Sequence, residues 1–196
     1  DKIININTND YSDVIQSDVI LDIEGHNEFI FISTIKGISI INKKDKNDKT
    51  YDERDGIPSN IVRCIYYDDL GYLWLGTTEG LAVLNLETDE ILDITNVLEK
   101  YISGDRYIGD IIKDKDGQYW IGTFVQGGLL RINPKDNTAK VYKRDEENNE
   151  SISSNSIRTL TEADDGSIWI GTSYGLNHFN KSTEEFRRYT TKDGLA

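Results

Sequence analysis

Short runs in which apolar and polar residues alternate follow one another along most of the chain. In its last quarter such runs cover residues 157–162, 167–172, 176–179 and 185–189. Alternation with a period of two is typical of a β-strand with one buried face. Glycine-containing turns between the runs favour hairpins. The pattern predicts four short antiparallel strands here, and almost no helix in the chain apart from one turn at 97–101.

The same block recurs around a tryptophan. Trp74, Trp120 and Trp169 are 46 and 49 residues apart, and each stands in a Trp-apolar-Gly-Thr sequence after an acidic, glycine-containing turn. A weaker copy, 43 residues upstream, has Phe31 for the tryptophan and Ser33 for the glycine. The aligned segments are FIFISTIKGISIIN, YLWLGTTEGLAVLN, QYWIGTFVQGGLLRIN and SIWIGTSYGLNHFN.

Four-stranded units that repeat every 43 to 49 residues are the sequence pattern of β-propeller blades. We therefore expect an all-β chain of four consecutive four-stranded antiparallel blades, a fragment of a larger propeller. The predicted units are residues 15–53, 59–95, 106–144 and 155–191. Residues 1–7 are expected to form the outer strand of a preceding blade, and the first and last residues suggest an excerpt from a longer polypeptide.

The repeated aromatic and glycine positions are predicted to be structural. A large flat side chain fills the wedge between neighbouring blades, and the glycine two positions later allows a close approach. The alternative is an exposed tryptophan platform for a ligand. The residues concerned are Phe31, Trp74, Gly76, Trp120, Gly122, Trp169 and Gly171.

Composition narrows the function classes. The chain has 22 basic and 35 acidic residues, a net charge of −13, which disfavours nucleic acids and anionic membrane surfaces as partners. The single cysteine, Cys64, permits no internal disulfide and is expected to be buried in an apolar run. No apolar stretch is long enough to span a bilayer, and the first residues do not resemble a signal peptide.

No catalytic constellation stands out, and we predict neither a cofactor nor a metal site. His26 and His178 have no partners at fixed spacing, and we expect them on exposed turn and strand surfaces. The turn at 114–117 has a slight likeness to a calcium loop, but hairpin geometry requires the same residues.

Candidate ligand-binding residues come from the linkers into each innermost strand and from the turns between second and third strands. Amides, guanidiniums and aromatic rings there would suit hydroxyls, a carboxylate or sugar rings. Alternatively, the two asparagines cap linker turns and the arginines pair with the acidic surface. The candidates are Asn60, Arg63, Glu79, Arg106, Tyr107, Phe124, Gln126, Asn155, Arg158 and Tyr174.

The three Trp-apolar-Gly-Thr copies, each followed by Gly-Leu or a close variant, resemble the two-component regulator propeller repeat. The linker at 56–60, Gly-Ile-Pro-Ser-Asn, is similar to the usual linker of that family. The resemblance implies the extracytoplasmic sensor region of a membrane-bound signalling protein, in which any kinase activity lies in other parts.

The resemblance favours a ligand-sensing module for a glycan or another small polar ligand. A protein-interaction scaffold is the alternative, and a polysaccharide lyase is a further one that lacks a visible acid/base set. Exposed sheet faces would also permit a homodimer in which two chains complete one ring.

Overall fold

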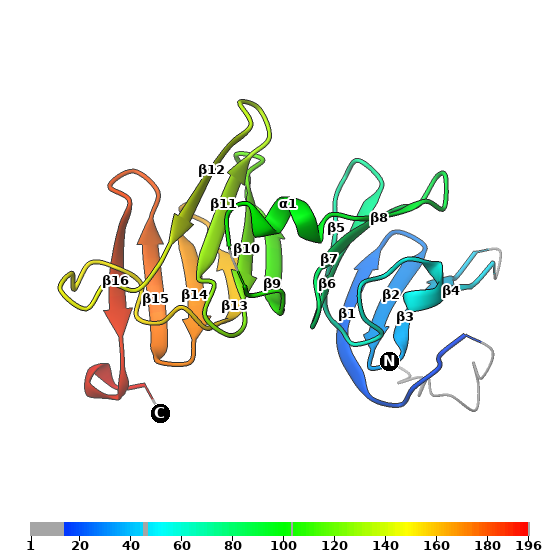
Figure 1. Ribbon diagram of the computed structural model, residues 1–196, viewed down its shortest axis with the longest axis horizontal. Coiled ribbons are helices and arrows are strands. Elements are labelled where there is room, and N and C mark those ends of the chain that lie inside the picture. Colours follow the sequence, from blue (N-terminus) through cyan, green and yellow to red (C-terminus); the bar gives the residue numbers. More distant parts are fainter. Residues whose placement is uncertain (1–13, 45–46, 103, 196) are drawn as a thin grey trace. The chain divides into compact units, whose positions relative to one another are not determined.

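The structure is a computed structural model that describes residues 14–44, 47–102 and 104–195, and it is almost entirely β (Figure 1). The strand predicted over residues 1–7 lies outside the described residues. The chain divides into two compact units, Asp1–Ile94 and Thr95–Ala196, and each unit contains two four-stranded sheets.

The first unit contains two antiparallel meanders, in which each strand pairs with the next along the chain. The first sheet consists of β1 (Ile20–His26), β2 (Phe29–Thr34), β3 (Gly37–Asn42) and β4 (Lys49–Tyr51). A 3-10 turn, Glu53–Asp55, leads to the second sheet of β5 (Val62–Tyr67), β6 (Tyr72–Thr77), β7 (Leu81–Asn85) and β8 (Ile91–Asp93).

The second unit opens with the short helix α1 (Thr95–Glu99), where the sequence predicts a helical turn two residues later. The third sheet consists of β9 (Ile108–Lys113), β10 (Tyr119–Thr123), β11 (Leu129–Asn133) and β12 (Thr138–Tyr142). The fourth consists of β13 (Ile157–Glu162), β14 (Ile168–Thr172), β15 (Gly175–Asn180) and β16 (Glu185–Tyr189), followed by a 3-10 turn at Thr191–Asp193. The predicted fold class of consecutive four-stranded antiparallel blades is confirmed, and the strands of the fourth sheet agree with prediction to within one residue at each end.

The threonine of each repeat closes the turn between the second and third strands. The Oγ1 atoms of Thr34, Thr77, Thr123 and Thr172 donate to the carbonyl of the turn glycine at 2.8–3.2 Å. A Cβ added at Gly37, Gly128 or Gly175 would lie 2.2–2.5 Å from the backbone oxygen of the last residue of the fourth strand, and all three glycines have positive φ. Glycine is therefore required at these positions.

Within each unit the core lies between the two sheets. Phe31 of the first sheet is fully buried and stacks on Tyr67 of the second, with ring centroids 5.4 Å apart. Trp120 of the third sheet is fully buried against Phe179 of the fourth, also at 5.4 Å. Gly122 lies so close to Ile157 that an added Cβ would be 2.4 Å from its Cγ2.

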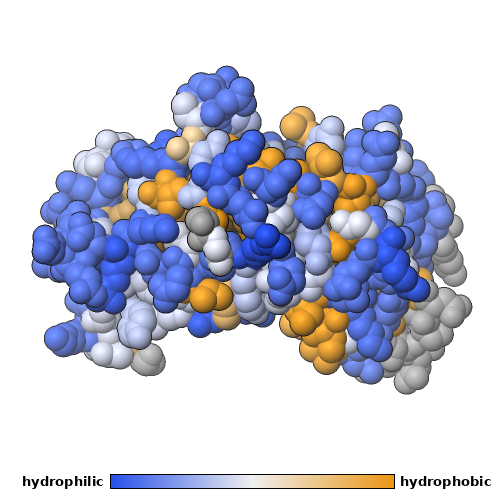
Figure 2. All heavy atoms as spheres, viewed as in Figure 1, coloured by the Kyte–Doolittle hydropathy of each residue, from blue (hydrophilic) through white to orange (hydrophobic). Residues whose placement is uncertain are grey.

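Trp74 and Trp169 lie at the corresponding positions of the second and fourth sheets, and both are half-buried. The Cys64 side chain is buried, as predicted. On the face drawn in Figure 2 hydrophilic side chains predominate, and hydrophobic ones form small separate groups.

The innermost strand of every sheet carries one extra residue. The register of its pairing with the second strand shifts at Leu21, Arg63, Gly109 and Arg158. Such a β-bulge bends the strand and redirects the side chain at that position. Two of the predicted binding residues, Arg63 and Arg158, thus occupy the same bulge position of different sheets.

Candidate ligand-binding site

The candidate site lies where the innermost strands of the second unit begin. In three sheets a backbone hydrogen bond joins the residue two positions before the bulge to the first residue of the turn after the second strand. The bonds are Thr78 N to Ile61 O, Phe124 N to Tyr107 O and Ser173 N to Ser156 O, at 2.7–3.2 Å. The framework is constant while the side chains differ, and only the third sheet places two aromatic rings there.

These two rings form a stack with a guanidinium. The rings of Tyr107 and Phe124 are nearly parallel, with centroids 4.3 Å apart and an angle of 14°. The Arg158 Cζ atom lies 3.6 Å from the centroid of the Phe124 ring. Tyr107 and Phe124 are half-buried, whereas Arg158 is exposed. The three side chains, two from the third sheet and one from the fourth, form what we call the aromatic shelf.

Serine hydroxyls hold the guanidinium in place. Arg158 Nε and Nη2 donate to Ser173 Oγ at 3.1 and 2.9 Å. Ser173 Oγ bonds Ser156 Oγ at 2.9 Å, and Ser156 Oγ donates to the carbonyl oxygen of Phe124. The chain of bonds fixes Arg158 over the ring, and the remaining N–H groups of its five can bond a ligand.

A buried carboxylate orders the turn beside the shelf. Asp105 Oδ2 accepts hydrogen bonds from the backbone N–H groups of Val125, Gln126 and Gly127 at 3.1, 2.7 and 2.7 Å. The Asp105 side chain is 6% exposed, so it acts on the turn and not on solvent. Charge-assisted bonds to three successive N–H groups make this turn, and the position of Phe124, rigid.

The other candidates in this unit have different surroundings. Arg106 pairs with Glu99 of α1, with Nε and Nη2 both 2.6 Å from Oε1. Asn155 Oδ1 accepts from Arg144 N at 2.7 Å, and its carbonyl accepts from Gly128 N, so it caps the linker. Gln126 and Tyr174 are exposed beside the shelf, Tyr174 by 68%.

Three candidates lie in the first unit. Asn60 Oδ1 accepts from Glu53 N at 3.0 Å while Asn60 N donates to Glu53 Oε1 at 2.7 Å, which joins the linker to the 3-10 turn. Arg63 is half-buried at its bulge, and Glu79 is exposed in the turn after β6. The structure therefore brings together Tyr107, Phe124 and Arg158, and it uses both asparagines as linker caps.

Sequence reasoning missed Asp105, Ser156 and Ser173. One signal was available for Asp105. The turn between Thr123 and Gly128 is two residues longer than the turn between Thr77 and Gly80, so it presents additional N–H groups that need an acceptor. The serines give no such signal, because Ser is common in linkers and turns.

The acidic turns are held by their own contacts. Asp114 accepts from the N–H groups of Asp116 and Gln118, and from Trp120 Nε1 at 2.9 Å. Lys181 Nζ lies 2.7–3.2 Å from Asp114, Asp116 and Glu162. In residues 14–44, 47–102 and 104–195, no three His, Cys, Asp or Glu side chains form a group that could hold a metal ion.

Both histidines pack against aromatic rings at tilted angles, so they are less exposed than the sequence predicts. His26 lies 4.5 Å from Tyr67 and His178 lies 4.7 Å from Trp169, centroid to centroid, and both are half-buried. No helix in the described part of the chain is long and apolar enough to cross a membrane.

Known families and structures agree with this architecture. The family described as two component regulator propeller matches residues 56–79, 102–124 and 151–174, which confirms the resemblance found in the sequence. No curated protein matches the chain.

Three solved structures illustrate the fold. The extracellular domain of the hybrid two component system BT3049 from B. thetaiotaomicron matches with a TM-score of 0.75 and 23% identity, over 90% of this chain and 23% of that one. The extracellular domain of the one component system BT4673 from the same organism matches with a TM-score of 0.68 and 24% identity, over 89% and 24%. Virginiamycin B lyase from Staphylococcus aureus matches with 0.67 and 14%, over 88% and 55%.

The likeness to these structures shows the fold of the chain, which is that of β-propeller blades. The chain spans about a quarter of the length of the two extracellular domains.

Proposed function

We propose that this chain, which carries two component regulator propeller repeats, is a non-catalytic ligand-sensing module of a signalling protein, and that it binds a glycan or another small polar ligand outside the cytoplasm. The observation that carries the proposal is the aromatic shelf of Tyr107, Phe124 and Arg158.

The shelf has the chemistry of saccharide recognition. A sugar ring has an apolar face that packs on an aromatic ring, and its hydroxyls or carboxylate bond a guanidinium. Because Asp105 and the serines already hold Phe124 and Arg158, little ordering is needed on binding. Preorganisation of this kind strengthens binding by reducing its entropic cost.

Two comparisons support the location and the sensing role. The family is that of two component regulator propellers, and two similar structures are extracellular domains of bacterial signalling systems. Asp105, the carboxylate that orders the turn beside the shelf, is buried under three N–H donors, which suits a structural role better than proton transfer.

The test is titration of the full chain with two probes, acidic oligogalacturonides and neutral xylo-oligosaccharides, followed by calorimetry. We expect Phe124→Ala to weaken binding of the recognised probe about tenfold or more, because the stacking surface is lost. Arg158→Lys keeps the charge and loses the planar stack, so we expect it to weaken binding as well.

The matched control is Leu70→Ala in the first unit, where the side chain is 71% exposed in a turn. It should leave affinity unchanged. Equal affinity of the parent chain and Phe124→Ala for both probes would contradict the shelf as the site. Turnover of either probe would contradict the non-catalytic role.

A protein partner is the second candidate. Val125 and Tyr174, 52% and 68% exposed, lie at corresponding turn positions beside the shelf and enlarge its apolar area. A partner that covers the turns would be weakened by Val125→Asp and Tyr174→Ala, whereas a saccharide on the shelf alone would tolerate Val125→Asp.

A further inference from the structure

The sheets within each unit are joined by the same ionic contact. In every sheet four cross-strand neighbours form a row on one face. The row of the first sheet is Glu24, Phe31, Ile40 and Lys49, and that of the third is Ile112, Trp120, Arg131 and Lys140. Both rows pack on the next sheet of their unit, through Phe31 on Tyr67 and Trp120 on Phe179.

In the first unit, Lys49 at the end of this row binds a carboxylate. Lys49 Nζ lies 2.6 Å from both carboxylate oxygens of Asp89, which belongs to the turn between β7 and β8. Tyr51 Oη donates to Asp89 Oδ1 at 2.9 Å. Lys49 and Tyr51 are two residues apart on β4, so both side chains reach the same acid.

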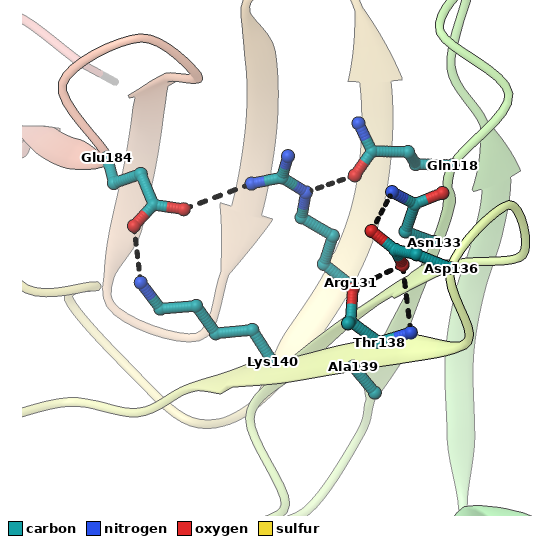
Figure 3. A pocket seen from close by; sticks show the side chains of 8 residues that line it. All are labelled: Gln118, Arg131, Asn133, Asp136, Thr138, Ala139, Lys140 and Glu184. Carbon is teal, nitrogen blue, oxygen red and sulfur yellow. Dashed lines mark hydrogen bonds and ion pairs between the residues drawn. The ribbon is translucent and has the colours of Figure 1, made fainter.

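The second unit repeats the contact at corresponding positions. Glu184, in the turn between β15 and β16, bonds Lys140 Nζ, Arg131 Nη1 at 3.1 Å and Tyr142 Oη at 3.3 Å. Glu184, Arg131 and Lys140 help to line a hollow of about 430 Å³, and Figure 3 shows Glu184 bonded to both basic residues. Asp89 and Glu184 share a left-handed backbone, with φ of 61° and 58°.

We call the two-part contact the latch. Its donors are a basic residue and a tyrosine, two residues apart on the fourth strand of one sheet. Its acceptor is an Asp or Glu with left-handed backbone conformation, in the turn between the third and fourth strands of the next sheet. Hydrogen bonding to Lys49 lowers the pKa of Asp89, and hydrogen bonding to Lys140 lowers that of Glu184. Both acceptors are thus charged at neutral pH.

The fourth sheet has a donor of the same kind. Its row is Thr161, Trp169, His178 and Arg187, and Tyr189 follows Arg187 by two residues. Arg187 lies 5.0 Å from the Tyr189 ring centroid, as Lys140 lies 5.1 Å from that of Tyr142. Trp169 and Tyr189 are half-buried and Arg187 is exposed, while Trp120 and Tyr142 are buried.

We propose that this face of the fourth sheet docks a further blade of the same repeat, selected by an Asp or Glu in its third-to-fourth turn that accepts from Arg187 and Tyr189. The partner is defined by charge complementarity and by likeness to the two existing interfaces. Not every blade would offer a donor, since the second sheet has Leu92 and Ile94 at these positions.

The linker after β16 supports covalent attachment of that blade. Thr190 and Asp193 form a reciprocal capping box, and Gly194 follows with φ 94°. Asp52, Asp55 and Gly56, with φ 108°, do the same between β4 and β5. In the first unit this linker leads from the sheet with Lys49 to the sheet with Asp89. The equivalent linker after β16 would lead from the sheet with Arg187 to the next blade.

The acceptor rule also argues against a second copy of this chain as the occupant. In the sequence, the third-to-fourth turn position that holds Asp89 and Glu184 corresponds to Lys46 in the first repeat. The first repeat of another chain would therefore offer Arg187 no acidic acceptor at that sequence position. A lysine in place of the acid is also unfavourable beside an arginine, because like charges repel.

The experiment extends the full chain after Gly194 with a copy of residues 57–94, which carries its own acceptor aspartate. We expect hydrogen exchange of the β16 amides to slow by about tenfold or more, because the appended blade covers the face. Replacing the acceptor aspartate of the appended copy by lysine should remove that protection, and adding Arg187→Glu should restore it.

Two controls separate the outcomes. Lys192→Ala, in the 3-10 turn after β16 and outside the latch, should leave protection unchanged. Equal protection with an aspartate or a lysine acceptor would overturn the selection rule. A parent chain that is dimeric by light scattering and becomes monomeric with Arg187→Glu would overturn the proposal in favour of a second copy.

Discussion

At the scale of single residues, one carboxylate joins a turn, an indole and a lysine. The Asp114 side chain is completely buried, and it accepts from two backbone N–H groups, Trp120 Nε1 and Lys181 Nζ. Burial would lower the pKa of Lys181, but hydrogen bonds to Asp116, Glu162 and Asp114 outweigh it and hold that pKa above its usual value. The turn N–H groups and the indole depend on Asp114 as their hydrogen-bond acceptor, and Lys181 depends on it as a buried counter-charge.

Asp114→Ala should therefore destabilise the second unit by about 3 kcal/mol, since it leaves a largely buried lysine, 16% exposed, and a buried indole N–H without their shared acceptor. Urea denaturation followed by tryptophan fluorescence measures the loss. Asp116→Ala is the matched control. Asp116 is 62% exposed and pairs with the same lysine, so its removal should cost less than about 1 kcal/mol. Equal costs would show that the buried network is not what stabilises the turn.

At the scale of strands and sheets, the sequence was sufficient for the regular part of the fold. The strands of the fourth sheet follow from alternation and from turn glycines, because each strand has one face in the core. The bulge could not be predicted. Its positions hold Leu21, Arg63, Gly109 and Arg158, which are not of one side-chain type, because a bulge is set by register and not by side chain.

The candidate site was predictable only in part for the same reason. Tyr107, Phe124 and Arg158 were identified from their places in linkers and turns, yet their stacking depends on the bulge at Arg158 and on contact between two sheets. Asn60 and Asn155 stand at linker positions where ligand-binding residues are also expected, so sequence position does not distinguish the two roles. The structure shows that both side chains bond the preceding segment. The latch was missed because its partners come from different repeats.

Between β1 and β5 a carboxylate makes the first unit sensitive to pH. Glu24 Oε2 accepts from Tyr67 N at 2.6 Å, and burial, with the nearby charge of Asp22, raises the pKa of Glu24 from 4.5 to about 7 despite that bond. Between these two values the folded state keeps a proton that the unfolded state has released. This group's contribution to stability is therefore complete below about pH 4.5 and is lost as the pH rises through about 7.

Glu24→Gln should remove this pH dependence, because the amide is neutral at every pH and still offers an oxygen to Tyr67 N. Since Glu24 is partly exposed, solvent screening reduces the effect to about 1 kcal/mol between pH 5 and pH 8. Hydrogen exchange of the β1 and β5 amides at both pH values gives the comparison. Glu28→Gln, on an exposed residue near the start of β2, should retain the parent's pH dependence. A parent whose β1 and β5 amides become better protected at pH 8 would contradict the assignment.

At the scale of the whole molecule, repulsion within an excess of 13 negative charges destabilises the folded state, whereas local ion pairs stabilise it. Exposed pairs such as Lys49–Asp89 and Lys140–Glu184 each contribute about 0–1 kcal/mol. Their partners are in contact, whereas the repulsion among the surplus acids acts over longer distances. Salt screens interactions beyond roughly 10 Å at 0.1 M far more than contacts do.

Raising NaCl from 10 to 300 mM should therefore increase the Tm by a few degrees, since more repulsion than attraction is screened. Calorimetry at fixed pH measures the change. The double variant Glu87→Lys and Glu147→Lys alters two exposed residues, one in each unit, and reduces the excess charge, so its gain with salt should be smaller. A Tm that falls with salt would mean that the latches and the Lys181 cluster outweigh the net charge. In that case the ion pairs between sheets, and not the apolar cores alone, would set the stability of each unit.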